Sequence, residues 1–160
     1  MGILDKLRKK PAELASAVKG TVVPMAEIPD QVFSQGILGL CIGVDPAEGT
    51  ICSPFDGKVT QMPDTFHAVG LQGSNGLEAL LHVGVDTVEM KGDGFAGLVK
   101  EGEAVKKGQP LLTVDLDKVK AAGHPAVVIH ILMDSDSFSK VTLTEAKTVE
   151  AGEPLMQVQK

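Results

Sequence analysis

The stretch TFHAVGLQGSNGLEALLHVGVD, residues 65–86, places the turn cluster GSNG between two apolar runs. Two such runs joined by a short turn rich in Gly and Asn are typical of an antiparallel β-hairpin. Each run carries one histidine, His67 in the first and His82 in the second. The segment therefore predicts a hairpin and raises the question of whether the two imidazoles meet.

The length of the hairpin loop decides how the two histidines are placed. With a two-residue loop (Ser74 and Asn75), or a four-residue loop over 73–76, His67 lies directly opposite His82, with Cβ atoms about 5 Å apart. A two-residue loop formed by Asn75 and Gly76 makes the two histidines diagonal neighbours on the same face. Only a loop of odd length puts them on opposite faces. We therefore expect the two histidines to meet.

The same alternation predicts which side chains accompany the histidines. Thr65 and Asp86 fall on their face, together with the aliphatic residues Leu80 and Val88. Two imidazoles in a dry core compete for hydrogen-bond partners, and protonating either one buries a charge. This face therefore favours a functional site over a pair of core histidines.

The rest of the chain has the pattern of an all-β protein. It has 160 residues, 43% of them apolar, with 18 Gly and 9 Pro, which suits many short strands joined by tight turns. The motif V-x-x-G-x-P-L-x-x-V occurs at 105–114 and again at 149–158, and helical signal is confined to short pieces such as 116–124. We predict an antiparallel β-sandwich or flattened barrel with hairpin repeats and short helical turns, forming a single domain over 20–160.

Residues 1–19 differ in character from this domain. Ile3, Leu4 and Leu7 fall at helical spacing beside several basic residues, and Pro11 limits the length of any helix. We expect a flexible tail, and the alternative is an amphipathic helix that makes weak contact with an anionic membrane surface. No apolar run has the length of a secretory signal or a membrane span.

Charge and cysteine content narrow the classes of partner. The net charge of −6 argues against nucleic acid, and Arg8 is the only arginine, so the body of the protein has no guanidinium clamp for phosphate. Cys41 and Cys52 lie in apolar surroundings without C-x-x-C spacing, which suits buried free thiols in a reducing compartment. We expect a cytoplasmic protein that needs no cofactor.

Two kinds of chemistry remain open for the histidines. The segments HVGVD (82–86) and HILMD (130–134) share the pattern H-x-x-x-D, which would suit a zinc hydrolase, and a weak metal site at His67 and His82 is a related alternative. Imidazole can also carry a phosphoryl group on one nitrogen while the other holds its proton in a fixed hydrogen bond. Residues 59–90 contain no Lys or Arg, so a phosphoryl site there would need a basic protein partner.

Several segments resemble one known family, the glucose-type IIA components of the bacterial sugar phosphotransferase system. These segments are LLHVGVDTVEMKGDGF (80–95), TFHAVG (65–70), PFDGKV (54–59) and IPDQVFSQGILG (28–39), and the resemblance covers residues 20–160. It implies that His82 accepts the phosphoryl group on Nε2 and that His67 stabilises it. It also implies that Thr65 supports His67 and that the backbone carbonyl of Gly84 fixes the Nδ1 proton of His82.

The resemblance also implies the partners of this phosphotransferase component. The donor would be the histidine-containing phosphocarrier protein, and the acceptor a cysteine on the IIB part of a IIB/IIC sugar permease. Asp30, Asp86 and Phe33 fall at positions that the family uses around its site. Leu80 and Val88 are expected to complete, with Phe33, a partner-binding depression. The chain has no IIB-like or IIC-like region, and we expect a free-standing IIA protein.

Two alternatives come from other classes of protein. A lipoyl or biotinyl carrier domain shares the repeated-hairpin style, and the segment EMKG would put Lys91 near a turn, but such domains are about half as long and the biotin motif has Met where this chain has Gly92. The second alternative is a binding module in which the histidines have only a structural role.

Overall fold

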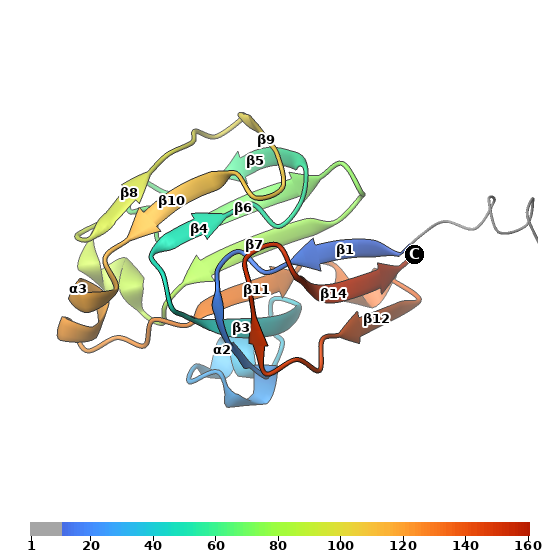
Figure 1. Cartoon of the computed structure of the whole chain (residues 1–160), viewed down its shortest axis with the longest axis horizontal. Coiled ribbons are helices and arrows are strands. Elements are labelled where there is room, and N and C mark those ends of the chain that lie inside the picture. The colour runs from blue at the N-terminus through green and yellow to red at the C-terminus, as the bar shows by residue number, and fades with distance from the viewer. Residues whose placement is uncertain (1–10) are drawn as a thin grey trace, which may run out of the picture.

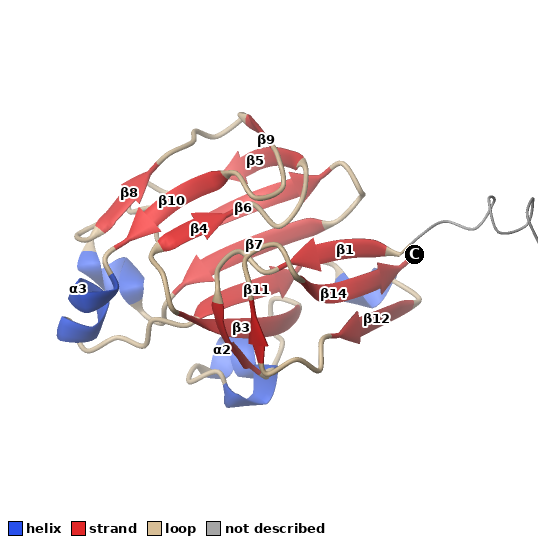
Figure 2. Ribbon diagram, in the orientation of Figure 1, coloured by secondary structure: helices blue, strands red, loops and turns tan. Residues whose placement is uncertain are grey.

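Short apolar runs between Gly and Pro turns form β-strands along the chain. Figures 1 and 2 show these strands in the computed structural model. The structure describes residues 11–160. Within this range none of the helices is long and apolar enough to span a bilayer.

The strands and helices follow one another in this order along the described residues: β1 (Ala12–Ala15), β2 (Gly20–Val23), η1 (Met25–Glu27), α2 (Gln31–Ser34), β3 (Leu40–Pro46), β4 (Thr50–Cys52), β5 (Gly57–Gln61), β6 (Ala68–Gly73), β7 (Glu78–Val83), η2 (Thr87–Met90), β8 (Phe95–Gly97), β9 (Ala104–Val105), β10 (Pro110–Val114), α3 (Leu116–Ala121), β11 (Val128–Leu132), η3 (Ser135–Ser137), β12 (Lys140–Leu143), β13 (Thr148–Val149) and β14 (Pro154–Gln159). The η elements are single turns of 3₁₀-helix.

The strands form one large sheet and two small ones. The large sheet has the order β13-β2-β3-β11-β7-β6-β5-β9, and the small sheets have the orders β1-β14-β12 and β4-β10-β8. A single apolar core joins side chains of both small sheets to those of the large sheet, so the small sheets cover one of its faces. A second, smaller cluster, which includes Ile28 and Phe33, packs η1 and α2 on β3 and β11. The predicted all-β sandwich is confirmed.

The repeated motif V-x-x-G-x-P-L-x-x-V connects the two layers of this sandwich. Its first Val lies in β9 or β13 of the large sheet, and its Pro begins β10 or β14 of a small sheet. The turn glycines, Gly108 and Gly152, have positive φ angles of 84° and 94°, which glycine adopts without steric cost. Each repeat therefore carries the chain from one layer to the other.

The β6–β7 hairpin forms, but its predicted register is wrong. Ala68, and not His67, lies opposite His82, and Gln72 lies opposite Glu78. The N–H of Gly73 donates to the carbonyl of Leu77, which encloses a loop of odd length. Gly76, the last residue of this loop, has a φ of 89°, as is typical of three-residue hairpin loops that end in a left-handed residue.

The predicted boundary between a tail and a domain is also wrong, because residues 12–18 belong to the fold. β1 pairs with β14, and the side chains of Leu14 and Val18 are fully buried in the main core. The sequence pattern of β1 is too short to identify it locally, and its partner strand lies at the other end of the chain. The amphipathic pattern at residues 3–7 falls outside the described residues.

His130 fixes the segment that follows β1. Its imidazole is fully buried on β11, with Nδ1 3.2 Å from the carbonyl oxygen of Val128, and the N–H of Ala17 donates to Nε2 at 3.0 Å. Burial lowers the pKa of His130 to about 4, against the opposing effect of its backbone hydrogen bonds. The histidine is therefore neutral at neutral pH and accepts a hydrogen bond that an imidazolium could not accept.

We predict that Leu14→Ala lowers the free energy of unfolding by roughly 2–5 kcal/mol, because it removes most of a buried side chain from the core. The exposed neighbour Glu13 gives the matched control, and Glu13→Ala should change stability by less than about 0.5 kcal/mol. Denaturant unfolding of the two variants makes the comparison. Equal stability would show that β1 does not belong to the cooperative unit.

We predict an acid-dependent loss of stability from His130. The unfolded chain binds this proton near the ordinary pKa of 6.5, whereas the folded chain binds it only near 4, so stability falls as the pH decreases through this window. Wild type should lose about 3 kcal/mol more than His130→Gln between pH 7 and pH 4, at about 1.4 kcal/mol for each pKa unit. Unfolding curves across this range measure it, and parallel pH profiles would contradict it.

Candidate functional site

The imidazoles of His67 and His82 meet where β7 ends and β6 begins, near the middle of the large sheet. Their ring centroids are 5.2 Å apart, and the rings are edge to face, at 77°. His82 lies near the end of β7, and His67 immediately precedes β6. The expected contact is confirmed, but not by strand alternation: Phe66 has a φ of 54°, so the chain turns sharply just before His67.

His82 is held on two sides. Its Nδ1 lies 2.7 Å from the carbonyl oxygen of Gly84, and its ring centroid is 5.0 Å from that of Phe33. Gly84 has a φ of 80°, which turns the chain back so that this carbonyl faces the imidazole. A carbonyl only accepts, so Nδ1 carries the proton of the neutral ring and Nε2 keeps a free lone pair.

Burial lowers the pKa of His82, and this effect outweighs three opposing ones. The hydrogen bond to the Gly84 carbonyl and the negative charges of Asp30 and Asp86 all raise the same pKa. The imidazole is therefore neutral at neutral pH, although two carboxylates act on it. A neutral, partly buried imidazole with a free Nε2 is a nucleophile.

His67 is held by Thr65. The Thr65 hydroxyl oxygen lies 2.5 Å from Nδ1 of His67. Burial lowers the pKa of His67, and the neighbouring His82 lowers it further. When the Thr65 hydroxyl donates to Nδ1, the proton of the neutral ring is on Nε2, where it can be donated to a ligand. With this tautomer of His67, the pair offers the lone pair of His82 Nε2 and the N–H of His67 Nε2.

Asp30 contributes through the helix that carries Phe33. Its carboxylate caps α2, accepting hydrogen bonds from the N–H groups of Val32 at 2.8 Å and Phe33 at 3.3 Å. The cap orients the short helix, and Phe33 is buried against His82. Asp30 therefore acts on His82 twice, through its charge and through the position of the Phe33 ring.

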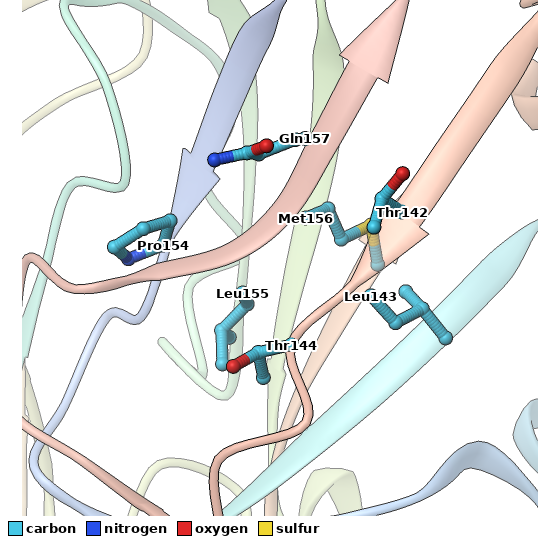
Figure 3. A pocket seen from close by; sticks show the side chains of 7 residues that line it. All are labelled: Thr142, Leu143, Thr144, Pro154, Leu155, Met156 and Gln157. Carbon is cyan, nitrogen blue, oxygen red and sulfur yellow. The ribbon is translucent and has the colours of Figure 1, made fainter.

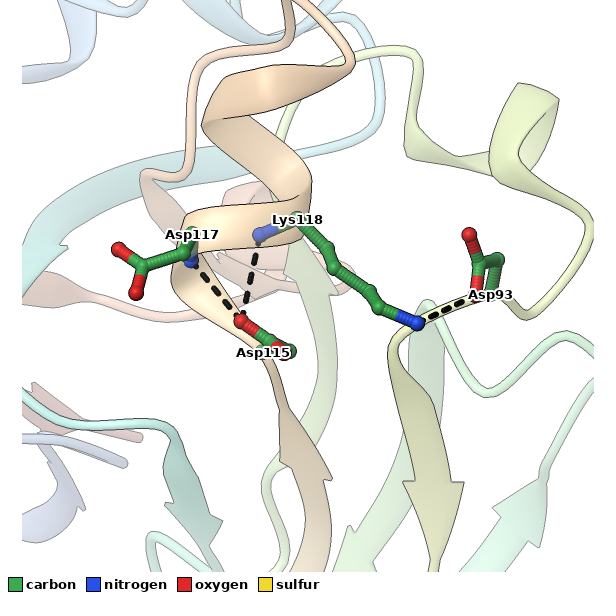
Figure 4. Close-up of polar contacts among 4 residues, drawn as sticks. All are labelled: Asp93, Asp115, Asp117 and Lys118. Atoms are coloured by element: carbon green, nitrogen blue, oxygen red, sulfur yellow. Dashed lines mark hydrogen bonds and ion pairs between the residues drawn. The ribbon is translucent and has the colours of Figure 1, made fainter.

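The loop between η2 and β8 supports the Thr65 side of the site. Gly92, in the left-handed region at φ 86°, lies against the backbone of Thr65, where a Cβ would come within 3.5 Å of its Cα. This loop is tied to α3 by an ion pair between Lys118 Nζ and Asp93 Oδ1 at 3.0 Å, and Asp115 caps the same helix (Figure 4). No sequence motif predicts this support.

Phe66 and Gly97 form a second contact that the sequence pattern does not predict. The ring of Phe66 lies on β8 at Gly97, where an added Cβ would come within 2.5 Å of a ring carbon. A phenylalanine with positive φ is unusual and needs surrounding structure to hold it. The only sequence signal was a glycine within a strand, which often marks a close approach.

The remaining predicted residues are placed less closely around the histidines. Asp86 is exposed and affects His82 through its charge, Leu80 is half-buried in the same small cluster as Phe33, and Val88 is 51% exposed on η2. Three further exposed apolar side chains, not predicted from the sequence, lie on α2 and the segment after it. These are Val32, Ile37 and Leu38.

The metal alternatives find no support in residues 11–160. No group of three His, Cys, Asp or Glu side chains in this range is arranged to hold a metal ion. His130, the histidine of the second H-x-x-x-D segment, is fully buried with backbone partners at both ring nitrogens. It faces the core on β11 and cannot join His82 as a ligand.

A hollow away from the histidines carries no evident chemistry. Residues of β12 and β14 and the segment after β12 line a pocket of about 210 Å³ (Figure 3). Its lining residues are Thr142, Leu143, Thr144, Pro154, Leu155, Met156 and Gln157, none of which titrates near neutral pH. The histidine pair lies elsewhere, where β7 ends and β6 begins.

Comparison with known proteins relates the chain to one family. The sequence model of one family matches residues 12–138, and its description is phosphoenolpyruvate-dependent sugar phosphotransferase system, EIIA 1. A solved structure, glucose permease IIA from Mycoplasma capricolum, superimposes with a TM-score of 0.81 at 28% identity, covering 92% of this chain and 96% of that one.

Two curated relatives are much longer proteins. The glucose-specific EIICBA component of Staphylococcus saprophyticus is 39% identical over 87% of this chain and 20% of its own length. The beta-glucoside-specific EIIBCA component of Bacillus subtilis is 38% identical over 88% of this chain and 23% of its own length. The chain thus spans about a fifth of the length of these relatives. Neither a zinc hydrolase nor a lipoyl carrier is among these matches.

We predict that Gly97→Val displaces the Phe66 ring and with it His67. The pKa of His67 should rise toward its ordinary value, because the moved imidazole loses burial, and the free energy of unfolding should fall by about 1–3 kcal/mol. Ala96→Val, at an exposed position of the same strand, is the matched control and should change neither quantity. NMR titration of the histidine ring protons measures the pKa. An unchanged His67 titration in Gly97→Val would show that Phe66 does not position His67.

Proposed function

The chain belongs to the EIIA 1 family of the phosphoenolpyruvate-dependent sugar phosphotransferase system, and on this premise we propose that it carries a phosphoryl group on His82. Membership of this family supports a role in phosphoryl transfer during sugar uptake. The residue and the direction of transfer are proposed from the site. The observation that carries them is the contact of two neutral imidazoles, one of which has a free Nε2.

His82 is the proposed acceptor. Its Nδ1 proton is engaged by the Gly84 carbonyl at 2.7 Å, so the lone pair of Nε2 attacks phosphorus as the bond between phosphorus and the donor's nitrogen breaks. The electron pair of that bond returns to the donor imidazole. Since the pKa of His82 is lowered, no proton has to leave Nε2 before the attack.

His67 is the proposed donor to the phosphoryl oxygens. With the Thr65 hydroxyl at its Nδ1, it presents Nε2–H beside His82. A hydrogen bond to an oxygen that gains charge in the transition state accelerates transfer without forming a covalent bond. His67 would therefore matter most when the group leaves His82.

The site carries negative charge, and the positive charge that would neutralise a phosphoryl group there has to come from a partner. Asp30 and Asp86 both act electrostatically on His82, and residues 59–90 contain no Lys or Arg. A phosphoryl group on His82 would be repelled by both carboxylates, so it would be held weakly and passed on readily. A basic partner surface would compensate this charge during each transfer.

The partners follow from the two directions of transfer. The proposed donor is the histidine-containing phosphocarrier protein, and the proposed acceptor is a cysteine of a IIB/IIC sugar permease. The relatives named EIICBA and EIIBCA combine such components in one chain, which supports the second partner. We place these steps in the cytoplasm, where the free thiols of Cys41 and Cys52 would remain reduced.

We predict different outcomes for the two histidines when the chain is incubated with phosphoenolpyruvate and the phosphocarrier cascade. His82→Gln should form no phosphoprotein, because the nucleophilic nitrogen is gone. His67→Gln should still be phosphorylated, but onward transfer to IIB should be roughly ten- to a thousand-fold slower, since a donor to the equatorial oxygens is worth a few kcal/mol. Mapping of acid-labile phosphate and single-turnover transfer measure the two steps.

His124→Gln is the control, because His124 lies outside the pair and is within 4.0 Å of Glu89 instead. It should behave as wild type in both steps. Phosphorylation of His82→Gln but not of His67→Gln would reverse the two roles. Wild-type behaviour of both variants would refute the proposed function.

A further inference from the structure

The loop that follows β7 is closed by a residue that the proposed mechanism does not use. Thr87 is fully buried at the start of η2, and its hydroxyl donates to the carbonyl of Val83 at 2.5 Å. Between these two residues the chain passes Gly84 and Asp86, with φ angles of 80° and 60°. A buried hydroxyl with one local acceptor fixes the loop more firmly than an exposed one, because no water replaces the bond.

The methyl group of Thr87 limits the position of Gly84. A Cβ added to Gly84 would lie 2.5 Å from Thr87 Cγ2 and 2.8 Å from the carbonyl oxygen of Pro125. On the other side, the N–H of Gly84 donates to the carbonyl of Val127 at 2.8 Å. The Gly84 backbone is therefore bound at its nitrogen and enclosed at its Cα, which leaves its carbonyl directed at His82.

We propose, on the basis of the proposed function, that Thr87 is a positioning residue that fixes the tautomer of His82. A neutral imidazole without a fixed acceptor exchanges between two tautomers, and its nucleophilic lone pair then alternates between Nε2 and Nδ1. Thr87 prevents this by holding the Gly84 carbonyl 2.7 Å from Nδ1 of His82. Its hydroxyl bonds to the Val83 carbonyl and not to an imidazole, so it acts through the loop.

The same loop closure extends to His67. The N–H of Val83 donates to the carbonyl of His67 at 2.7 Å, while the carbonyl of Val83 accepts from Thr87. Val83 thus connects the backbone of one histidine to the residue that orients the other. Loss of the Thr87 hydrogen bond should therefore disturb the positions of both His67 and His82. The first effect should be on the ring tautomer of His82.

The test separates the hydroxyl of Thr87 from its methyl group in the full chain. Thr87→Val keeps the shape and removes the hydroxyl, whereas Thr87→Ser keeps the hydroxyl and removes the methyl group. In the unphosphorylated protein, the ¹⁵N shifts of the His82 ring should move toward the tautomer average in Thr87→Val and stay near wild type in Thr87→Ser. Phosphorylation by the phosphocarrier cascade should slow about tenfold in Thr87→Val and change less than about twofold in Thr87→Ser.

A purely structural role predicts a different result. If Thr87→Val folds and is phosphorylated more slowly while the His82 tautomer is unchanged, the proposal is overturned, and an unchanged rate and tautomer overturn it as well. Thermal unfolding is measured first, and Thr87→Ala replaces Thr87→Val if the latter does not fold. If the wild type accepts no phosphate, the proposed function fails, but the ring shifts still decide the role of Thr87.

Discussion

The hydrogen bond between Nδ1 of His82 and the carbonyl of Gly84 is the interaction on which the arrangement of the site depends. A neutral imidazole has one proton, and the partner of that proton decides which nitrogen keeps the lone pair. Burial keeps the ring neutral against the charges of Asp30 and Asp86. In a straight strand the next carbonyls would point into the ladder. β7 ends directly after His82, and the sharp turn at Gly84 brings its carbonyl to Nδ1 of the imidazole.

His82 on β7 and His130 on the neighbouring strand β11 have different environments in the sandwich. His82 on β7 lies opposite Ile129 on β11, and the next residue, His130, points to the other face. His130 lies among core residues with backbone partners at both nitrogens, so it supports the fold and is chemically inert. His82 has Nδ1 hydrogen-bonded, and within residues 11–160 its Nε2 has no hydrogen-bond partner. Because successive side chains of a β-strand point to opposite faces of the sheet, His130 and His82 lie on opposite faces.

The sequence predicted the class of fold and the contact of the two histidines, but not how the contact arises. The Gly and Pro positions of the repeats define turns by local chemistry, and these turns form as expected. The hairpin register depended on a loop whose possible lengths the cluster GSNG does not distinguish. The chain turns sharply just before His67, where Phe66 packs on Gly97 and has a φ of 54°, and a strand pattern cannot predict this turn. β1 was missed because its stability comes from β14, which lies at the opposite end of the sequence.

The pairing of β1 with β14 has a consequence for how this unit can be connected to other polypeptides. Ala12 lies opposite Val158, so the first and last strands of the fold lie side by side (Figure 1). Domains whose ends are adjacent tolerate insertion and circular permutation. Joining these ends through a short linker and opening the chain at the turn around Gly102, where an added Cβ would meet no atom within 4 Å, should leave the histidine pair in place. The architecture that holds the imidazoles should then form from the same strands synthesised in another order.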